Sequence, residues 1–437
     1  MALPIALQSL IGSSLALVDN LMVGTLGERE LAAVGVGIQP FFIYWMVTFG
    51  FVSGTATFMS QFFGNKDIKN IKKTLGFAVT VSMCFGSLFF ILCMFFPGFI
   101  VNLFTNINEI KPLAIQYIKI GSPCFLFIAV TVPFTFCLRS TQQAKIPLFT
   151  SSFAFCMNTF FNYVLIFGKF GAPRLGVAGA AISTIIARSL EMLLVLFVVF
   201  YRKNIIAGRF KEYFGWKKEF AKRIIGVAIP TTLNETIWGV GFAMYTAAYA
   251  RVGKTAFAAV QMARALEHLF IMAAFSIGDA ALILIGQRLG AGETEYGYQL
   301  AKKMLKIGTG FGVVAGLLLI AVSKPVISLY KEFTPEAEMY AFYILLIYGL
   351  TMGIVVFNGM SVTGILRSGG DTKCAMMIDC GGVWLIGVPI AFITTQFLGL
   401  PIHLAVLLVT TEEIVKFFAF LWRFLSKKWV KNVINNM

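Results

Sequence analysis

Charged residues are scarce in this chain. Asp, Glu, Lys and Arg together make up 13% of its 437 residues, about half the share found in ordinary soluble domains. Apolar residues make up 58%, and the mean hydropathy is +0.83. This composition excludes a soluble globular fold and predicts a membrane protein, whose spanning backbone must be helical or a closed barrel.

Histidine is rarer still, with two residues in the whole chain, and no His-Glu-x-x-His, Asp-x-x-x-Asp or Asp-Asp sequence occurs. The seven cysteines show no spacing typical of a metal site or a disulfide framework. No phosphate-binding loop of the Walker type is present, so we expect no nucleotide-driven pump. We assign no catalytic residues, and a membrane-bound prenyl or acyl transferase is only a distant alternative. No basic segment precedes the first apolar run, so no cleaved signal peptide is expected.

Long uncharged runs such as Phe85–Phe96 predict helices, because barrel strands would alternate polar and apolar residues. We therefore predict an all-α polytopic fold with twelve transmembrane helices. The expected spans are roughly residues 3–25, 31–62, 74–98, 112–138, 147–168, 177–200, 223–250, 256–287, 303–323, 337–366, 374–398 and 402–422.

The net charge of +16 is distributed in a way that indicates topology. Alternate loops carry about three times as many Lys and Arg residues as the loops between them, which places both termini in the cytoplasm. We expect a multi-pass protein of the bacterial plasma membrane, with the lipid bilayer as its partner and no nucleic acid.

The chain contains an internal repeat. Pro4 matches Pro230, and Gln61 matches Gln287, both at a spacing of 226 residues. At a spacing of 228 residues, Leu138-Arg139-Ser140 matches Leu366-Arg367-Ser368. Duplicated halves in an apolar chain are typical of secondary transporters.

The repeat and the loop lengths predict the domain organisation. We expect a six-helix lobe at 1–200, a cytoplasmic linker at 201–222, a second six-helix lobe at 223–425 and a basic cytoplasmic tail at 426–437. Because each half holds an even number of helices, the two bundles should be related by a pseudo-two-fold axis along the membrane normal.

Several motifs resemble one family in an ordered set that covers nearly the whole chain. The region from Pro4 through Asp19 to Gly35 resembles the opening of multidrug and toxic compound extrusion (MATE) transporters. Further resemblance lies in Ser60–Gly64, Asn162–Gly168, Leu175–Ala181 and Gly364–Lys373.

The resemblance implies alternating-access export of cationic or amphiphilic small molecules, driven by entry of protons or sodium. No cofactor other than this coupling ion is expected, and we expect a monomer. The alternative is a lipid-linked precursor flippase of the same wider superfamily. Such a protein should ring its cleft with arginine to hold a pyrophosphate, whereas the cleft candidates here are mostly acidic.

Asp19 is the first candidate for ion coupling. An unpaired carboxylate in a membrane helix either takes up a proton or holds a cation, although an interfacial residue reaching water is the alternative. The resemblance places Asn158, Asn162 and Thr184 beside it as a possible sodium site. Asn162 stands where the family has a second carboxylate, so a hard cation would lose one charged ligand, which favours protons.

Glu235 is the second candidate, both for coupling and for the substrate cleft. Trp238, Phe242 and Tyr245 follow it on one helical face. An acid below such aromatic residues suits a lipophilic cation through charge pairing and cation–π contact. An interfacial aromatic belt is the alternative.

Asp379 could supply a further coupling acid, or it could pair with Lys373 at the cytoplasmic end. Glu267 is expected to line the cleft on the eighth helix. Arg188 with Glu191, Arg264 with Glu267, and Glu412 or Glu413 with Lys416 are spaced as neutralised structural pairs.

Pro4 and Pro230 occupy equivalent positions in the two halves. Each removes a backbone donor, so either a static kink or a hinge is expected near the acids.

Overall fold

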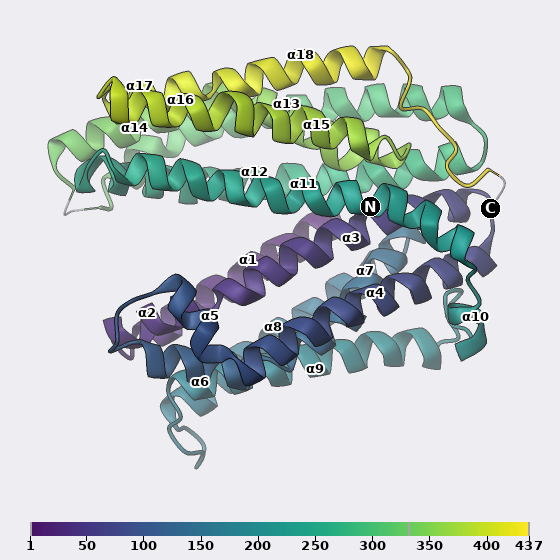
Figure 1. The fold of residues 1–437 in the computed structure, drawn as a ribbon, viewed down its shortest axis with the longest axis horizontal. Helices are drawn as coiled ribbons and strands as arrows, with labels where there is room; N and C mark the ends of the chain where they lie inside the picture. Colours follow the sequence, from purple (N-terminus) through teal and green to yellow (C-terminus); the bar gives the residue numbers. More distant parts are fainter. Residues whose placement is uncertain (1, 331–332, 436–437) are drawn as a thin grey trace. The chain divides into compact units, whose positions relative to one another are not determined.

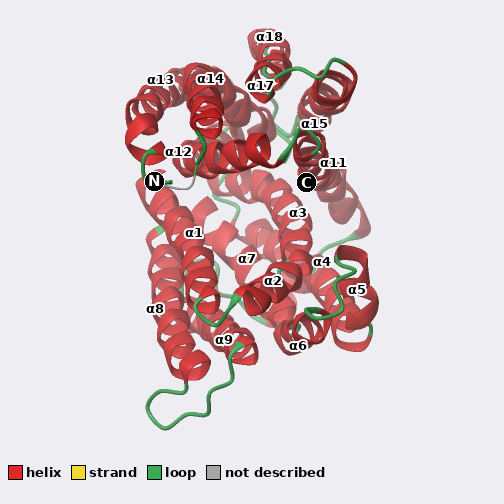
Figure 2. Cartoon of the chain, turned by 90° about the vertical axis from the view of Figure 1, so that its left-hand side faces the viewer, coloured by secondary structure: helices red, strands yellow, loops and turns green. Residues whose placement is uncertain are grey.

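The computed structural model describes residues 2–330 and 333–435, and all twelve predicted spans are helical in it. Helices joined by short loops account for the described chain, in which no strand occurs (Figure 2). By length and hydropathy, eight of the described helices can each span a membrane. A ninth span is a pair of helices bent by 50°.

The chain divides into two compact units, Leu3–Ala228 and Ile229 onward. The boundary falls inside a single helix, α11, and directly precedes Pro230. Residues 223–228 therefore group with the first unit, although the repeat and the loop lengths predict that the second lobe begins at residue 223.

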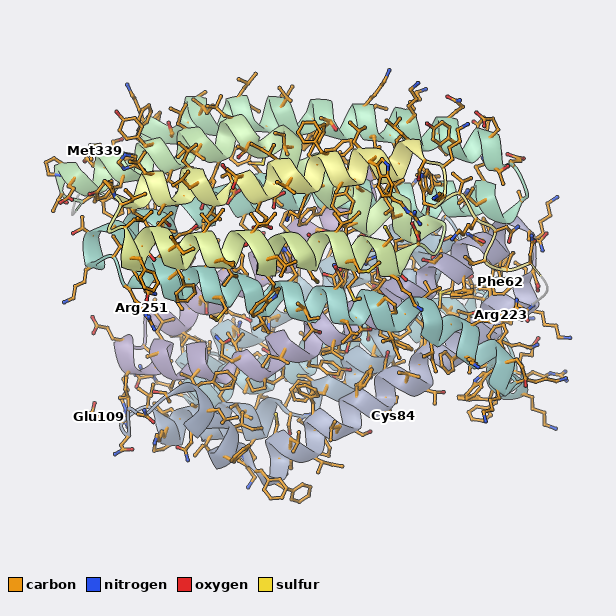
Figure 3. The ribbon with its side chains drawn as sticks, turned by 45° about the horizontal axis from the view of Figure 1, so that its top comes forward. Phe62, Cys84, Glu109, Arg223, Arg251 and Met339 are labelled. Atoms are coloured by element: carbon orange, nitrogen blue, oxygen red, sulfur yellow. The ribbon has the colours of Figure 1, made fainter. Side chains whose placement is uncertain are left out.

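Among the described residues, unit 1 contains ten helices and the start of an eleventh; Figure 1 labels them along the chain. They are α1 (Ala2–Gly24), α2 (Glu28–Gly37), α3 (Gln39–Gly64), α4 (Ile68–Phe95), α5 (Pro97–Phe104), α6 (Lys111–Gly121), α7 (Cys124–Ser140), α8 (Lys145–Phe167), α9 (Val177–Tyr201), α10 (Phe210–Phe214) and the first residues of α11 (Lys218–Ala250). Glu109 lies at one end of this unit, and Phe62 and Arg223 lie at the other (Figure 3).

Unit 2 begins within α11 and is interrupted by π-helical turns. Its elements are α12 (Lys254–Gly290), α13 (Thr294–Ile327), α14 (Pro335–Met360), η1 (Ser361–Leu366), α15 (Thr372–Gly382), η2 (Val383–Gly387), α16 (Val388–Phe392), η3 (Ile393–Phe397), α17 (Ile402–Val409) and α18 (Thr411–Leu425). Wide turns of this kind are frequent at functional sites. Glycines let α13 and α14 pack closely, since a Cβ on Gly316 would lie 2.1 Å from the backbone oxygen of Gly349.

The expected basic tail packs onto unit 2. Trp429 is fully buried, donates its Nε1 hydrogen to the backbone oxygen of Phe424 at 3.1 Å, and stacks on the Phe424 ring. Lys427 pairs with Glu295 of α13 at 3.1 Å. Residues 426–435 are thus part of the folded unit, and the last two residues of the expected basic tail lie outside the described residues.

The backbone repeats as the sequence does. Gly27 and Gly253, which are 226 residues apart, precede α2 and α12 with φ/ψ of 144°/166° and 145°/164°. Lys66 and Gly292, at the same spacing, both have left-handed φ, at 59° and 81°. The duplicated halves therefore use the same turns, even where the residue differs.

We predict that Gly253→Ala lowers the apparent melting temperature of the purified protein more than Gly292→Ala does. Neither added Cβ would meet an atom within 4 Å, so the comparison isolates backbone strain. The Gly253 conformation is essentially restricted to glycine and costs other residues about 1–3 kcal/mol. Equal melting temperatures for the two variants would contradict this explanation.

Candidate functional site

Asp19 lies on α1 against two asparagines of α8. Asn162 donates an Nδ2 hydrogen to Asp19 Oδ1 and another to Asn158 Oδ1, the latter at 3.1 Å. Both asparagines are fully buried, and Asp19 is half-buried. Their spacing of four residues places Asn158 and Asn162 on one face of α8, so the structure brings together three of the four residues expected at this site.

Two atoms of this group lack a hydrogen-bond partner among the described residues, namely Asn158 Nδ2 and Asn162 Oδ1. Leaving a buried amide atom without a hydrogen bond costs free energy, unless a further ligand such as water or a cation contacts that atom. Asn162 can donate its NH₂ to an ionised Asp19 or, after rotation of the amide, accept the O–H of a protonated one. The group therefore suits a carboxyl that changes its protonation state.

Thr184, the fourth expected residue, donates its hydroxyl hydrogen to the backbone oxygen of Ala180 at 3.0 Å. Tyr117 of α6 is hydrogen-bonded to Thr184 and interacts electrostatically with Asp19. Tyr117 is a site neighbour that sequence reasoning missed, because a single tyrosine on another helix gives no spacing signal.

A second polar network crosses unit 1. The ion pair of Arg188 with Glu191, predicted from their spacing, is confirmed at 2.8 Å. Ser151 donates to the other Glu191 oxygen at 2.8 Å, and Gln8 donates to Ser151 at 2.9 Å. Arg188 also interacts electrostatically with Asp19, whose hydrogen-bond partner is the Asn162 amide.

The two halves share an arginine contact. In unit 1, Arg139 at the end of α7 donates to Gln8 Oε1 at 2.8 Å. In unit 2, Arg367 donates to Glu235 Oε1 at the same distance. The arginines are repeat equivalents, and each reaches the helix that carries Pro4 or Pro230, one turn beyond the proline. The arginine meets a neutral amide in the first half and a carboxylate in the second.

Asp379 belongs to a buried cluster around Lys416 of α18. The Lys416 Nζ lies 3.4 Å from Asp379, 2.7 Å from Glu412 and 2.5 Å from Glu413, and its side chain is 4% exposed. The prediction that Lys416 pairs with Glu412 or Glu413 is confirmed, with both carboxylates in contact. The structure pairs Asp379 with Lys416 rather than with Lys373, and Asn234 donates to it at 3.2 Å.

Amides and a phenol complete the cluster. Asn358 of α14 donates to Glu413 Oε2 at 2.8 Å, and Tyr245 of α11 donates to Glu412. Three carboxylates surround one ammonium group, so the cluster carries an excess of negative charge when all are ionised. Lys416 lies between the three carboxylates. Among the described residues, no group of three or more His, Cys, Asp or Glu side chains could hold a metal ion.

The aromatic residues beyond Glu235 divide into two sets. Trp238 stacks on Phe242, with ring centroids 5.6 Å apart, and Phe242 is 42% exposed. Tyr245 is buried and donates its hydroxyl hydrogen to Glu412. The continuous ladder expected from helical spacing is therefore limited to Trp238 and Phe242, because α11 turns its later aromatics into the interior of unit 2.

Phe242 already has a cation on its face. The guanidinium carbon of Arg264 lies 4.3 Å from the Phe242 ring centroid, and Arg264 donates to Thr246 Oγ1 at 3.1 Å. Glu267 is half-buried on α12 and interacts electrostatically with Arg264 and with Glu413. A positive group from the chain itself thus occupies the ring face where helical spacing predicts a substrate cation.

Comparisons with known proteins agree with these observations. The MatE family model matches residues 4–164 and again 230–393, two segments that begin 226 residues apart, as the internal repeat does. A probable multidrug resistance protein NorM of Thermotoga maritima is 24% identical over 438 residues, which cover 99% of this chain and 93% of that protein.

Further likeness is found in sequence and in fold. The multidrug resistance protein MdtK of Yersinia pseudotuberculosis is 25% identical over 407 residues, covering 90% of this chain and 86% of that protein. A crystal structure of MATE in the straight conformation has a TM-score of 0.88 at 17% identity, covering 98% of this chain and 95% of that one. The twelve-helix architecture is that of MATE transporters. The chain belongs to the MatE family, as its sequence motifs indicate.

Proposed function

We propose that this protein is an antiporter that exports cationic or amphiphilic drugs by alternating access, driven by inward movement of protons or sodium. Family membership and relatives named as multidrug resistance proteins support drug export. The observation that carries ion coupling is Asp19, a membrane-helix carboxylate hydrogen-bonded to an amide and beside unsatisfied amide atoms.

Asp19 couples ion entry to drug exit through its charge. When ionised, it accepts from Asn162 and favours a positively charged ligand nearby. When it takes up a proton or a cation, that attraction is lost and the drug is released. The coupling free energy is reciprocal, so the drug weakens ion binding as much as the ion weakens drug binding.

Protons fit Asp19 better than sodium does. The site offers one carboxylate and the amide oxygens of Asn158 and Asn162, and the Thr184 hydroxyl is engaged with α9 and Tyr117. A hard cation prefers several oxygen ligands, with enough charge to replace its water. A proton needs only the carboxyl and one acceptor.

Unit 2 supplies a second set of coupling acids in this proposal. Glu235 is held by Arg367, and Asp379 by Lys416. Protonation of either acid would weaken its ion pair and free the helix that carries it. Trp238 and Glu267 are proposed to contact substrate when Arg264 moves off Phe242.

The flippase alternative is less well supported. A pyrophosphate site needs free arginine side chains in fork geometry. Here Arg139 is bonded to Gln8, Arg188 to Glu191 and Arg367 to Glu235, while Arg264 lies against aromatic rings. A multi-pass monomer in the bacterial plasma membrane, with both termini cytoplasmic, remains part of the proposal.

We predict that drug-sensitive cells expressing the chain extrude ethidium with sodium replaced by potassium, and that Asp19→Asn and Glu235→Gln each stop this efflux. An amide keeps the shape of either carboxyl but cannot exchange a proton. Glu219→Gln, the same change on an exposed acid, is the control and should transport normally. Wild-type rates in Asp19→Asn would remove Asp19 from the mechanism. Absence of efflux under any gradient would redirect testing to lipid-linked substrates.

We predict that Pro230→Ala folds but loses transport, because a restored backbone donor stiffens α11 at the boundary between the two units. Pro325→Ala, inside α13 and away from the boundary, is the matched control. Folding is read from size-exclusion profiles and transport from ethidium efflux. Full transport by Pro230→Ala would show that the kink is static.

We predict that Lys416→Met lowers the apparent melting temperature strongly, since removing one partner from a buried ion cluster costs about 3–5 kcal/mol. Adding Glu412→Gln and Glu413→Gln to this variant should restore most of the loss by removing the stranded charges. Lys302→Met, on an exposed lysine, is the control. If Lys416→Met melts at the wild-type temperature, the cluster does not depend on its lysine.

A further inference from the structure

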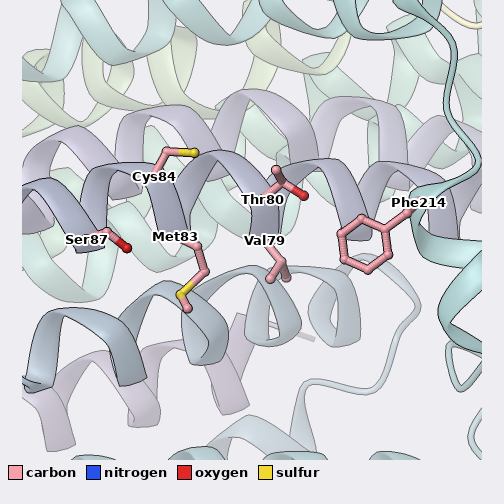
Figure 4. Close-up of a pocket in the computed structure, with 6 residues that line it drawn as sticks. All are labelled: Val79, Thr80, Met83, Cys84, Ser87 and Phe214. Atoms are coloured by element: carbon pink, nitrogen blue, oxygen red, sulfur yellow. The ribbon is translucent and has the colours of Figure 1, made fainter.

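A groove runs along the outer face of α4, far in sequence from Asp19 and the acids of unit 2. It has a volume of about 410 Å³, and α4 lines most of it with side chains one helical turn apart (Figure 4). The lining residues are Val79, Thr80, Met83, Cys84, Ser87 and, at one end, Phe214 of α10.

The groove belongs to the lipid-facing surface of unit 1. Beyond Ser87, α4 exposes Leu88, Ile91 and Phe95, with exposed fractions of 52%, 47% and 68%. Large apolar side chains exposed over several turns of a membrane helix face hydrocarbon. An acyl chain lying along this face would fill the groove, where Thr80 already donates its hydroxyl hydrogen to the Gly76 backbone oxygen at 2.8 Å.

The short helix α10 closes one end of the groove. It packs tightly on α4, because a Cβ on Gly76 would lie 2.0 Å from the Tyr213 backbone oxygen. Tyr213 is buried, while Phe210 and Phe214 are 76% and 41% exposed with ring centroids 4.3 Å apart. A helix that buries one side and exposes paired aromatics beside a basic segment is typical of the membrane interface.

Positive charge is concentrated around this end. Residues 202–223 contain eight Lys or Arg, all exposed, and two Glu. Of the acids, Glu212 accepts from the Arg209 backbone N–H and pairs with Lys72 at 3.3 Å, contacts that hold its pKa below the ordinary value. Glu212 thus stays ionised and engaged at neutral pH. Lys211 and Lys217 lie three residues on either side of Phe214.

We propose that this groove is a binding site for one anionic glycerophospholipid. An acyl chain lies along α4 from Val79 to Ser87, and the phosphate lies at the α10 end, near Lys211 and Lys217. Charge complementarity selects the anionic headgroup, since each basic residue near a membrane surface contributes about 1 kcal/mol toward anionic lipid. The site lies on the segment between the two halves, so its occupant would hold that segment against α4.

The test is native mass spectrometry of the full-length protein, titrated in detergent with dioleoyl phosphatidylglycerol or dioleoyl phosphatidylcholine. We expect one phosphatidylglycerol to be retained at least about fivefold more tightly than phosphatidylcholine. The double variant Lys211→Ala/Lys217→Ala should remove that preference. Lys302→Ala/Lys303→Ala, which deletes the same charge from exposed positions on α13, should keep it.

Two further arms separate the acyl chain from the headgroup. Thr80→Phe fills the groove and should weaken retention of both lipids. Excess inorganic phosphate should leave the bound phosphatidylglycerol in place if the acyl chain contributes. The proposal is overturned if the two lipids are retained equally, if the two lysine double variants behave alike, or if phosphate alone displaces the lipid. None of these readouts depends on drug transport.

Discussion

Hydrocarbon offers no hydrogen-bond partner, so a charged side chain inside this helical protein is stabilised when another group of the same chain contacts it. On insertion scales, a charge at the middle of a membrane helix costs about 2.5–3.5 kcal/mol. The structure meets that cost with contacts between helices: Asp19 against Asn162, Glu235 against Arg367, and Asp379 against Lys416. These contacts join neighbouring helices within each unit, and in the proposed mechanism they are the places where a change of protonation would loosen that packing.

The two halves share the same backbone turns and the same arginine contact, but the partner of that arginine differs in charge. The same arginine, at Arg139 and at Arg367, reaches the proline-bearing helix in each half, yet it meets a glutamine in one and a glutamate in the other. Only the second contact can respond to a proton. The halves thus share turns and this arginine contact but differ in the charge of the partner, so in the proposed mechanism the two bundles would respond differently to protonation.

Much of the fold could be predicted from the sequence because its signals are local. Apolar runs located the helices, and the Gly27 and Gly253 turns recur at the spacing of the repeat. Contacts between near neighbours, such as Arg188 with Glu191, also followed from helical spacing. The partners of Glu235 and Asp379 could not be predicted. Arg367 is 132 residues from Glu235, and pattern alone does not say which helices meet.

The aromatic residues on α11 show why spacing was insufficient there. Residues 238, 242 and 245 lie on one helical face. Packing against the neighbouring helices buries Tyr245 on one side of that face and leaves Phe242 exposed on the other. The guanidinium of Arg264, on α12, packs on the electron-rich face of the Phe242 ring. A site suited to a foreign cation is thus filled by an internal one. A cationic substrate would compete with Arg264 for the ring, so drug binding and the position of α12 would be linked by direct displacement.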